Sequence, residues 1–113
     1  MADEADEISR LEQFRQIVAM EPDDYFAHFG LASTLVEEGY YKEAVHEFRE
    51  TLRLKPDFSA AIRDLGKALE KVGEPEEAMR AYREGIPIAE RNGDLQTMKE
   101  MRVFLTRLEA GRR

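Results

Sequence analysis

The chain has 113 residues, of which 36% are charged and 42% are apolar, and its net charge is −7. This composition is typical of one soluble helical domain. The absence of cysteine excludes disulfides and thiolate metal sites, and the negative charge argues against general nucleic-acid binding. The sequence has no run of 18 apolar residues and no basic segment followed by an apolar one. We therefore expect neither a membrane span nor a secretory leader, and we predict a cytoplasmic location.

Apolar residues at helical spacing predict six helices, and therefore an all-α fold. In chain order the predicted helices span residues 7–20, 24–38, 41–54, 58–72, 75–91 and 94–110. Gly39 and Gly73 each follow such a helix, as helix-ending glycines do. Pro75 falls in a first turn, where its missing N–H costs nothing. Residues 1–7, MADEADE, are expected to form a flexible acidic tail, because they hold too little apolar surface to pack.

The most informative pattern is a repeat with a period of 34 residues. Ala44 recurs as Ala78 and Phe48 recurs as Tyr82, and one period before Phe48 stands Phe14. A fixed period of this length indicates stacked helical hairpins, in which each unit buries its apolar face against its neighbours. Small side chains are expected at Ala44 and Ala78, where two helices cross closely.

Residues 25–58 and 59–92 resemble tetratricopeptide repeats, whose signature runs W-x2-L-G-x2-Y, then A-x3-F, then P. The positions of the first unit that match this signature are His28, Leu31, Ala32, Leu35, Ala44, Phe48 and Pro56. Those of the second unit are Ile62, Leu65, Gly66, Leu69, Ala78 and Tyr82, with Glu90 in place of the proline. Residues 8–24 match only the second half of a unit, with Phe14 and Pro22 in place but Arg10 where alanine is usual.

This resemblance implies a right-handed α-solenoid of antiparallel helix pairs. Residues 8–113 would form one domain, made of a half repeat (8–24), two repeats (25–58 and 59–92) and a capping helix (93–113). We expect the cap to begin after Asn92-Gly93 with Asp94 as its N-cap. Its covering stripe is predicted to be Leu95, Met98, Met101, Leu105 and Leu108. Pro87 lies inside the fifth helix, which it should kink or end early.

In this family the first helix of each unit lines a concave groove that holds a segment of another protein. The groove residues that we predict are two aromatic ones, one polar one and three basic ones: Phe26, Phe29, Ser33, Arg63, Lys67 and Lys71. The basic row would attract a partner of acidic character. Alternatively, that row is a solvated face balanced by Asp64, Glu70 and Glu74, and the two phenylalanines pack against Ile17 or Met20 of the first helix.

Two other readings find less support in the sequence. The chaperone-tail grooves of this family carry a lysine and asparagines where Phe29, Ser33 and Asp64 stand here, so binding of such tails is not expected. Glu43, His46, Glu47 and Glu50 share one face of a helix and include a Glu-x-x-His pattern of di-iron bundles. We expect this face to point outward into solvent, and we interpret His28 as a packed, hydrogen-bonded core residue. No phosphate loop, catalytic nucleophile, cofactor or metal site is predicted, so we expect no enzyme.

Two hypotheses about function follow. The first is a non-catalytic adaptor that binds a peptide or a helix of a partner protein in the groove. The second is a self-assembling structural module, or a fragment of a longer array, that associates end to end. It is motivated by the half repeat and by the charge of the two ends. Residues 1–24 carry two basic and eight acidic groups, hence −6, whereas residues 93–113 carry five basic and three acidic groups, hence +2.

Overall fold

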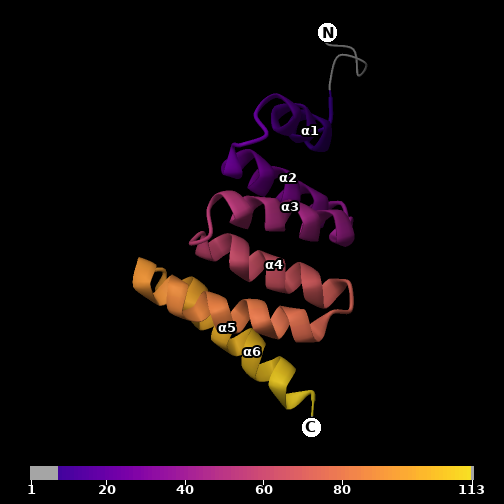
Figure 1. Ribbon diagram of the computed structural model, residues 1–113. Helices are drawn as coiled ribbons and strands as arrows, with labels where there is room; N and C mark the ends of the chain where they lie inside the picture. Colours follow the sequence, from indigo (N-terminus) through magenta and orange to yellow (C-terminus); the bar gives the residue numbers. More distant parts are fainter. Residues whose placement is uncertain (1–7, 113) are drawn as a thin grey trace.

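The computed structural model describes residues 8–112, which form six helices stacked in chain order into an elongated body of 55 × 28 × 22 Å (Figure 1). Each helix packs on its neighbours in the sequence, and α4 also contacts α6. The helices are α1 (Arg10–Met20), α2 (Tyr25–Glu37), α3 (Tyr41–Leu54), α4 (Ser59–Lys71), α5 (Pro75–Asn92) and α6 (Leu95–Ala110). The all-α repeat fold is thereby confirmed.

The predicted helix limits agree with the structure to within one residue for the last five helices. The first helix begins later than the predicted residue 7, because the hydroxyl of Ser9 accepts a hydrogen bond of 3.0 Å from the backbone N–H of Glu12 and caps it there. The predicted acidic tail, residues 1–7, lies outside the described residues.

Left-handed glycines make the tight turns between antiparallel helices. Gly39, Gly73 and Gly93 have φ values of +83°, +80° and +76°, a region that glycine enters without steric cost. After α2, the backbone N–H of Tyr40 reaches back to the carbonyl of Leu35 at 2.8 Å and satisfies an otherwise free helix end. The predicted role of these glycines is confirmed.

Small residues set how closely the helices approach. Ala44 and Ala78 are fully buried, as predicted, and so are Phe48 and Tyr82 four residues further along. The ring of Tyr82 lies directly over Gly66, where an added Cβ would come within 2.2 Å of a ring carbon. The interior of this stack therefore leaves no room for an additional methyl group at that point.

Helix α6 covers the last apolar face, but not with all the residues predicted. Met98 and Met101 are buried, and Leu105 and Leu108 are partly buried. Leu95 was wrongly placed in this stripe: it is 52% exposed. Phe104, which was not predicted, packs on the core instead, with its ring centroid 5.6 Å from that of Tyr82.

Asp94 stands at the N-cap position of α6, but the prediction that its side chain caps the helix is wrong. The carboxylate instead accepts a hydrogen bond from the hydroxyl of Ser59, at the start of α4. This contact ties the α5–α6 turn to the start of α4, so the side chain serves tertiary packing rather than the helix end.

A kink or an early end was expected at Pro87; the early end is contradicted, because α5 continues past this proline to Asn92. Pro87 cannot donate to the carbonyl four residues earlier, that of Arg83. Both residues are exposed, so water can solvate this carbonyl.

We predict that Ala78→Leu lowers the free energy of unfolding by about 1–3 kcal/mol, because the added atoms overpack a fully buried crossing. Chemical denaturation followed by circular dichroism measures this change. Arg80→Leu, on the exposed side of the same helix, is the matched control and should change stability far less. Equal stabilities for wild type and Ala78→Leu would contradict the packing described.

Candidate partner-binding groove

A depression of about 330 Å³ opens between α2, α3 and α4. Residues from all three helices line it: Ser33, Val36, Tyr41, Phe48, Asp64, Lys67 and Lys71. Its walls combine apolar and aromatic surface with two ammonium groups. The structure therefore brings three of the six predicted groove residues, Ser33, Lys67 and Lys71, to one place.

The two lysines extend over aromatic rings. Nζ of Lys71 lies 5.9 Å from the ring centre of Tyr41, and Nζ of Lys67 lies 6.0 Å from that of Phe104 in α6. Both lysines are exposed, and within residues 8–112 neither makes an ion pair with a carboxylate. Each ammonium group thus lies at the outer range of a cation–π contact and is not neutralised by a direct contact with a carboxylate.

Arg63, the third predicted cation, lies apart from this pair. Its guanidinium binds Asp64 at 2.9 Å and Glu100 of α6 at 3.1 Å, and its side chain is largely buried. This arrangement also engages the carboxylate of Asp64, which lines the depression. Arg63 therefore offsets the one negative side chain in the wall rather than presenting a free charge.

Aromatic residues connect the depression with the N-terminal part of α2. Phe29 packs on Phe48 and Phe58, with ring centroids 6.0 and 4.7 Å away. Phe26 lies 6.2 Å from Phe29 and is 62% exposed. We call Phe26, Phe29 and Phe58 the aromatic ledge. Phe29 is thus partly buried by rings of α3 and of the α3–α4 turn, a contact that neither reading of the sequence predicted.

Sequence reasoning missed several residues that shape this surface. Tyr41 and Phe104 place the lysines, and Phe58 supports Phe29. Phe58 and Phe104 stand outside the repeat signature, and Tyr41 opens a helix where a side chain's direction depends on the turn before it. The sequence contained one indication that Phe104 faces the core: it follows Met101, which is buried, by three residues and so lies on the same side of the helix.

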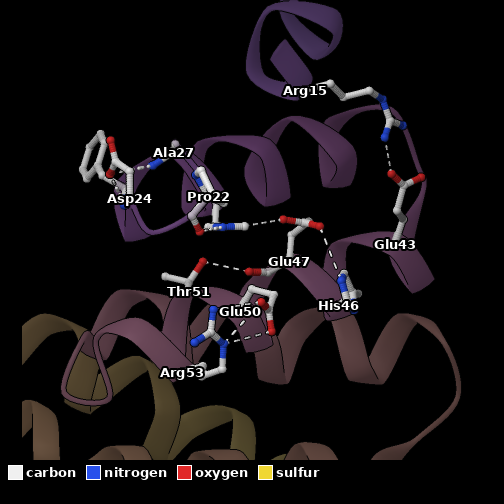
Figure 2. Close-up of polar contacts among 12 residues, drawn as sticks. Arg15, Pro22, Asp24, Ala27, Glu43, His46, Glu47, Glu50, Thr51 and Arg53 are labelled. Carbon is white, nitrogen blue, oxygen red and sulfur yellow. Dashed lines mark hydrogen bonds and ion pairs between the residues drawn. The ribbon is translucent and has the colours of Figure 1, made fainter. Parts of the chain in front are cut away.

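His28 is buried, as predicted, and both of its ring nitrogens face oxygen acceptors. Nδ1 lies 2.7 Å from Oε1 of Glu47, and Nε2 lies 2.7 Å from the carbonyl oxygen of Pro22. Glu47 belongs to α3 and Pro22 to the α1–α2 turn (Figure 2), so the two hydrogen bonds of His28 join three parts of the chain. Only the protonated imidazolium can donate to both oxygens at once.

The predicted outward orientation of the acidic face of α3 is wrong for Glu47, which is buried against α2. The reason is the hydrogen bond to His28, which gives the carboxylate a partner in the interior. Glu43 and Glu50 do lie nearer the surface and pair with Arg15 and Arg53 (Figure 2). Among residues 8–112 no group of three or more His, Asp or Glu side chains is placed to hold a metal ion.

No helix in the described part of the chain is both long and apolar enough to cross a membrane.

Comparison with known proteins gives consistent results. The tetratricopeptide repeat family matches residues 35–101. A Bordetella parapertussis protein of known solution structure is 30% identical and superposes with a TM-score of 0.80, over 93% of this chain and 91% of the other. A tetratricopeptide repeat domain protein from Salinibacter ruber is 25% identical, with a TM-score of 0.71 over 79% and 90%.

The fold is also similar to that of the TPR2B domain of yeast Sti1, which was solved in a complex with pHsp70. The two are 14% identical and superpose with a TM-score of 0.82 over 89% of this chain and 81% of the other. No curated protein sequence matches the chain significantly.

The geometry around His28 predicts a pH dependence of stability. Burial alone would lower the pKa of His28, but the hydrogen bonds to Glu47 and Pro22 and the charge of Glu47 outweigh it and raise this pKa above 6.5. A raised folded-state pKa stabilises the fold below the unfolded pKa, and this contribution is lost as the pH rises through the folded value. We therefore expect stability to fall as the pH rises above about 6.5.

Replacing His28 with glutamine should remove most of this pH dependence, and Glu47→Gln should reduce it. Denaturant unfolding at a series of pH values measures the slope. Arg80→Gln, an exposed residue of α5 outside this network, is the control and should keep the slope of the wild type; His46 is unsuitable because its Nε2 lies 3.7 Å from Oε2 of Glu47. Identical slopes for wild type and His28→Gln would overturn this assignment.

Proposed function

The chain belongs to the tetratricopeptide repeat family, and we propose that it is a non-catalytic module that binds a segment of a partner protein. The segment occupies the depression between α2, α3 and α4 and extends over the aromatic ledge. The observation that carries this proposal is the pair Lys67 and Lys71, exposed beside an aromatic wall without a carboxylate partner in the described residues.

The chemistry of the walls indicates what the segment contains. A carboxylate side chain fits near the two ammonium groups, where it gains Coulomb attraction and charge-assisted hydrogen bonds. An aromatic or large aliphatic side chain fits on Phe26, whose exposed ring gives the apolar contact area that binding anchors use. The bound segment is therefore acidic and carries at least one large apolar residue.

The rigid framework supports binding by preorganisation. Phe48 and Phe58 hold the ring of Phe29 in place, so this side chain is already ordered before the segment binds. The domain of Sti1 with a similar fold is a precedent for a complex with another protein. Because the groove is short, we expect affinity in the micromolar range. An adaptor role in the cytoplasm remains a prediction.

The proposal is tested with a displayed library of random dodecapeptides, selected on the immobilised wild-type chain. We expect the enriched peptides to carry a net negative charge and an aromatic or large aliphatic residue. A labelled peptide from this selection is then titrated by fluorescence anisotropy. Lys67→Glu/Lys71→Glu should bind it at least about tenfold more weakly, because two attractive charges become repulsive.

Lys42→Glu/Arg80→Glu is the matched control, with the same change in net charge on exposed residues outside the depression. It should bind the peptide with nearly the affinity of the wild type. Phe26→Ala should weaken binding, whereas Tyr40→Ala, which removes another exposed aromatic side chain, should not. Enrichment of basic peptides, or equal losses in the two charge-reversed variants, would contradict the proposal.

A further inference from the structure

The two ends of the stack present apolar side chains that no described residue covers. At one end, α1 packs on α2 through Leu11, Phe14 and Val18, and none of its own residues is fully buried. Ile17 and Met20 are 42% and 78% exposed. Exposed aliphatic residues gathered on one helix are typical of interaction surfaces. We call this surface, with Gln16 beside it, the α1 face.

At the opposite end, α6 has a comparable surface. A shallow depression of about 390 Å³ runs along it, lined by Arg102, Val103, Thr106, Arg107 and Ala110. Val103 is 61% exposed, although it lies in the middle of the helix. We call this surface the α6 face. It is apolar along its centre and flanked by arginines.

The charges of the two faces are complementary. Around the α1 face lie Glu12, Glu21 and Asp23, which are all exposed. On α6, Lys99 and Arg102 are exposed and make no ion pair within residues 8–112. The sequence strengthens this asymmetry, because its first 24 residues carry a net charge of −6 and residues 93–113 carry +2. Two copies placed end to end therefore attract each other, whereas two like ends repel.

We propose that the α1 face of one copy binds the α6 face of a second copy. In the repeat, α1 takes the place of a second helix, because Phe14 aligns with Phe48, and α6 follows α5 in the place of a first helix. A contact between α6 and the next copy's α1 therefore continues the alternation of first and second helices. Such a heterologous contact has no two-fold axis, so it propagates into chains or closes into rings.

The first test is the dependence of mass on protein concentration and salt for the 113-residue chain. We expect light scattering to show that the average mass rises between micromolar and millimolar concentrations at low ionic strength. High salt should reduce this rise, because the Debye length shrinks from about 30 Å at 0.01 M to about 3 Å at 1 M. A monomer at every concentration and salt level would overturn the proposal.

A mixing experiment tests the polarity of the contact. Ile17→Ser/Met20→Ser removes the apolar centre of the α1 face, and Val103→Glu places a negative charge on the α6 face. Each variant alone should associate at least about tenfold more weakly than the wild type. Mixed together, they retain one intact α1 face and one intact α6 face, so they should form a one-to-one dimer and no larger species.

Tyr40→Ser, which removes an exposed apolar side chain away from both ends, is the control and should associate as the wild type does. Circular dichroism should show that each variant is folded, because all four substituted residues are exposed. Association of either variant alone as strong as that of the wild type, or a mixture that stays monomeric while the wild type associates, would overturn the proposal.

Discussion

The close approach of neighbouring helices is the constraint on which the rest of the structure depends. Fully buried alanines at Ala44 and Ala78 allow each hairpin to close, and Gly66 lets the ring of Tyr82 lie against the backbone of α4. This packing fixes the rotation of α4 about its axis. One side of the helix enters the core, and the opposite side carries Lys67 and Lys71 into the depression. The geometry of the candidate groove is therefore a consequence of the packing.

The repeat made much of this predictable. A period of 34 residues places Ala78, Tyr82 and Gly73 by analogy with Ala44, Phe48 and Gly39, and these are the residues that define crossings and turns. What the period does not contain was harder to predict. Leu95 and Asp94 follow the last full unit, where the chain departs from the pattern and the neighbouring surface decides which side chains are buried.

The pairing of side chains between different helices also could not be predicted from the sequence. In the sequence, Glu47 is one of several acidic residues on a polar helix face. Its burial is explained only by the position of His28 on the neighbouring helix. Arg63 and Lys67 belong to one basic row, yet Glu100 on α6 pairs with the first and leaves the second exposed. In both cases the outcome depends on a residue far away in the sequence. Spacing along one helix contains no information about such a residue.

We propose that an acidic, partly apolar segment binds between α2, α3 and α4. The most direct measurement is a titration of the isotope-labelled chain with a polyglutamate peptide that carries one phenylalanine, followed through the amide resonances. We predict that the largest shift changes cluster at Ser33, Lys67 and Lys71, which line the depression, and at Phe26 on the ledge. Changes confined to the opposite side of α5, around Arg80, or no saturable change at all, would contradict the account.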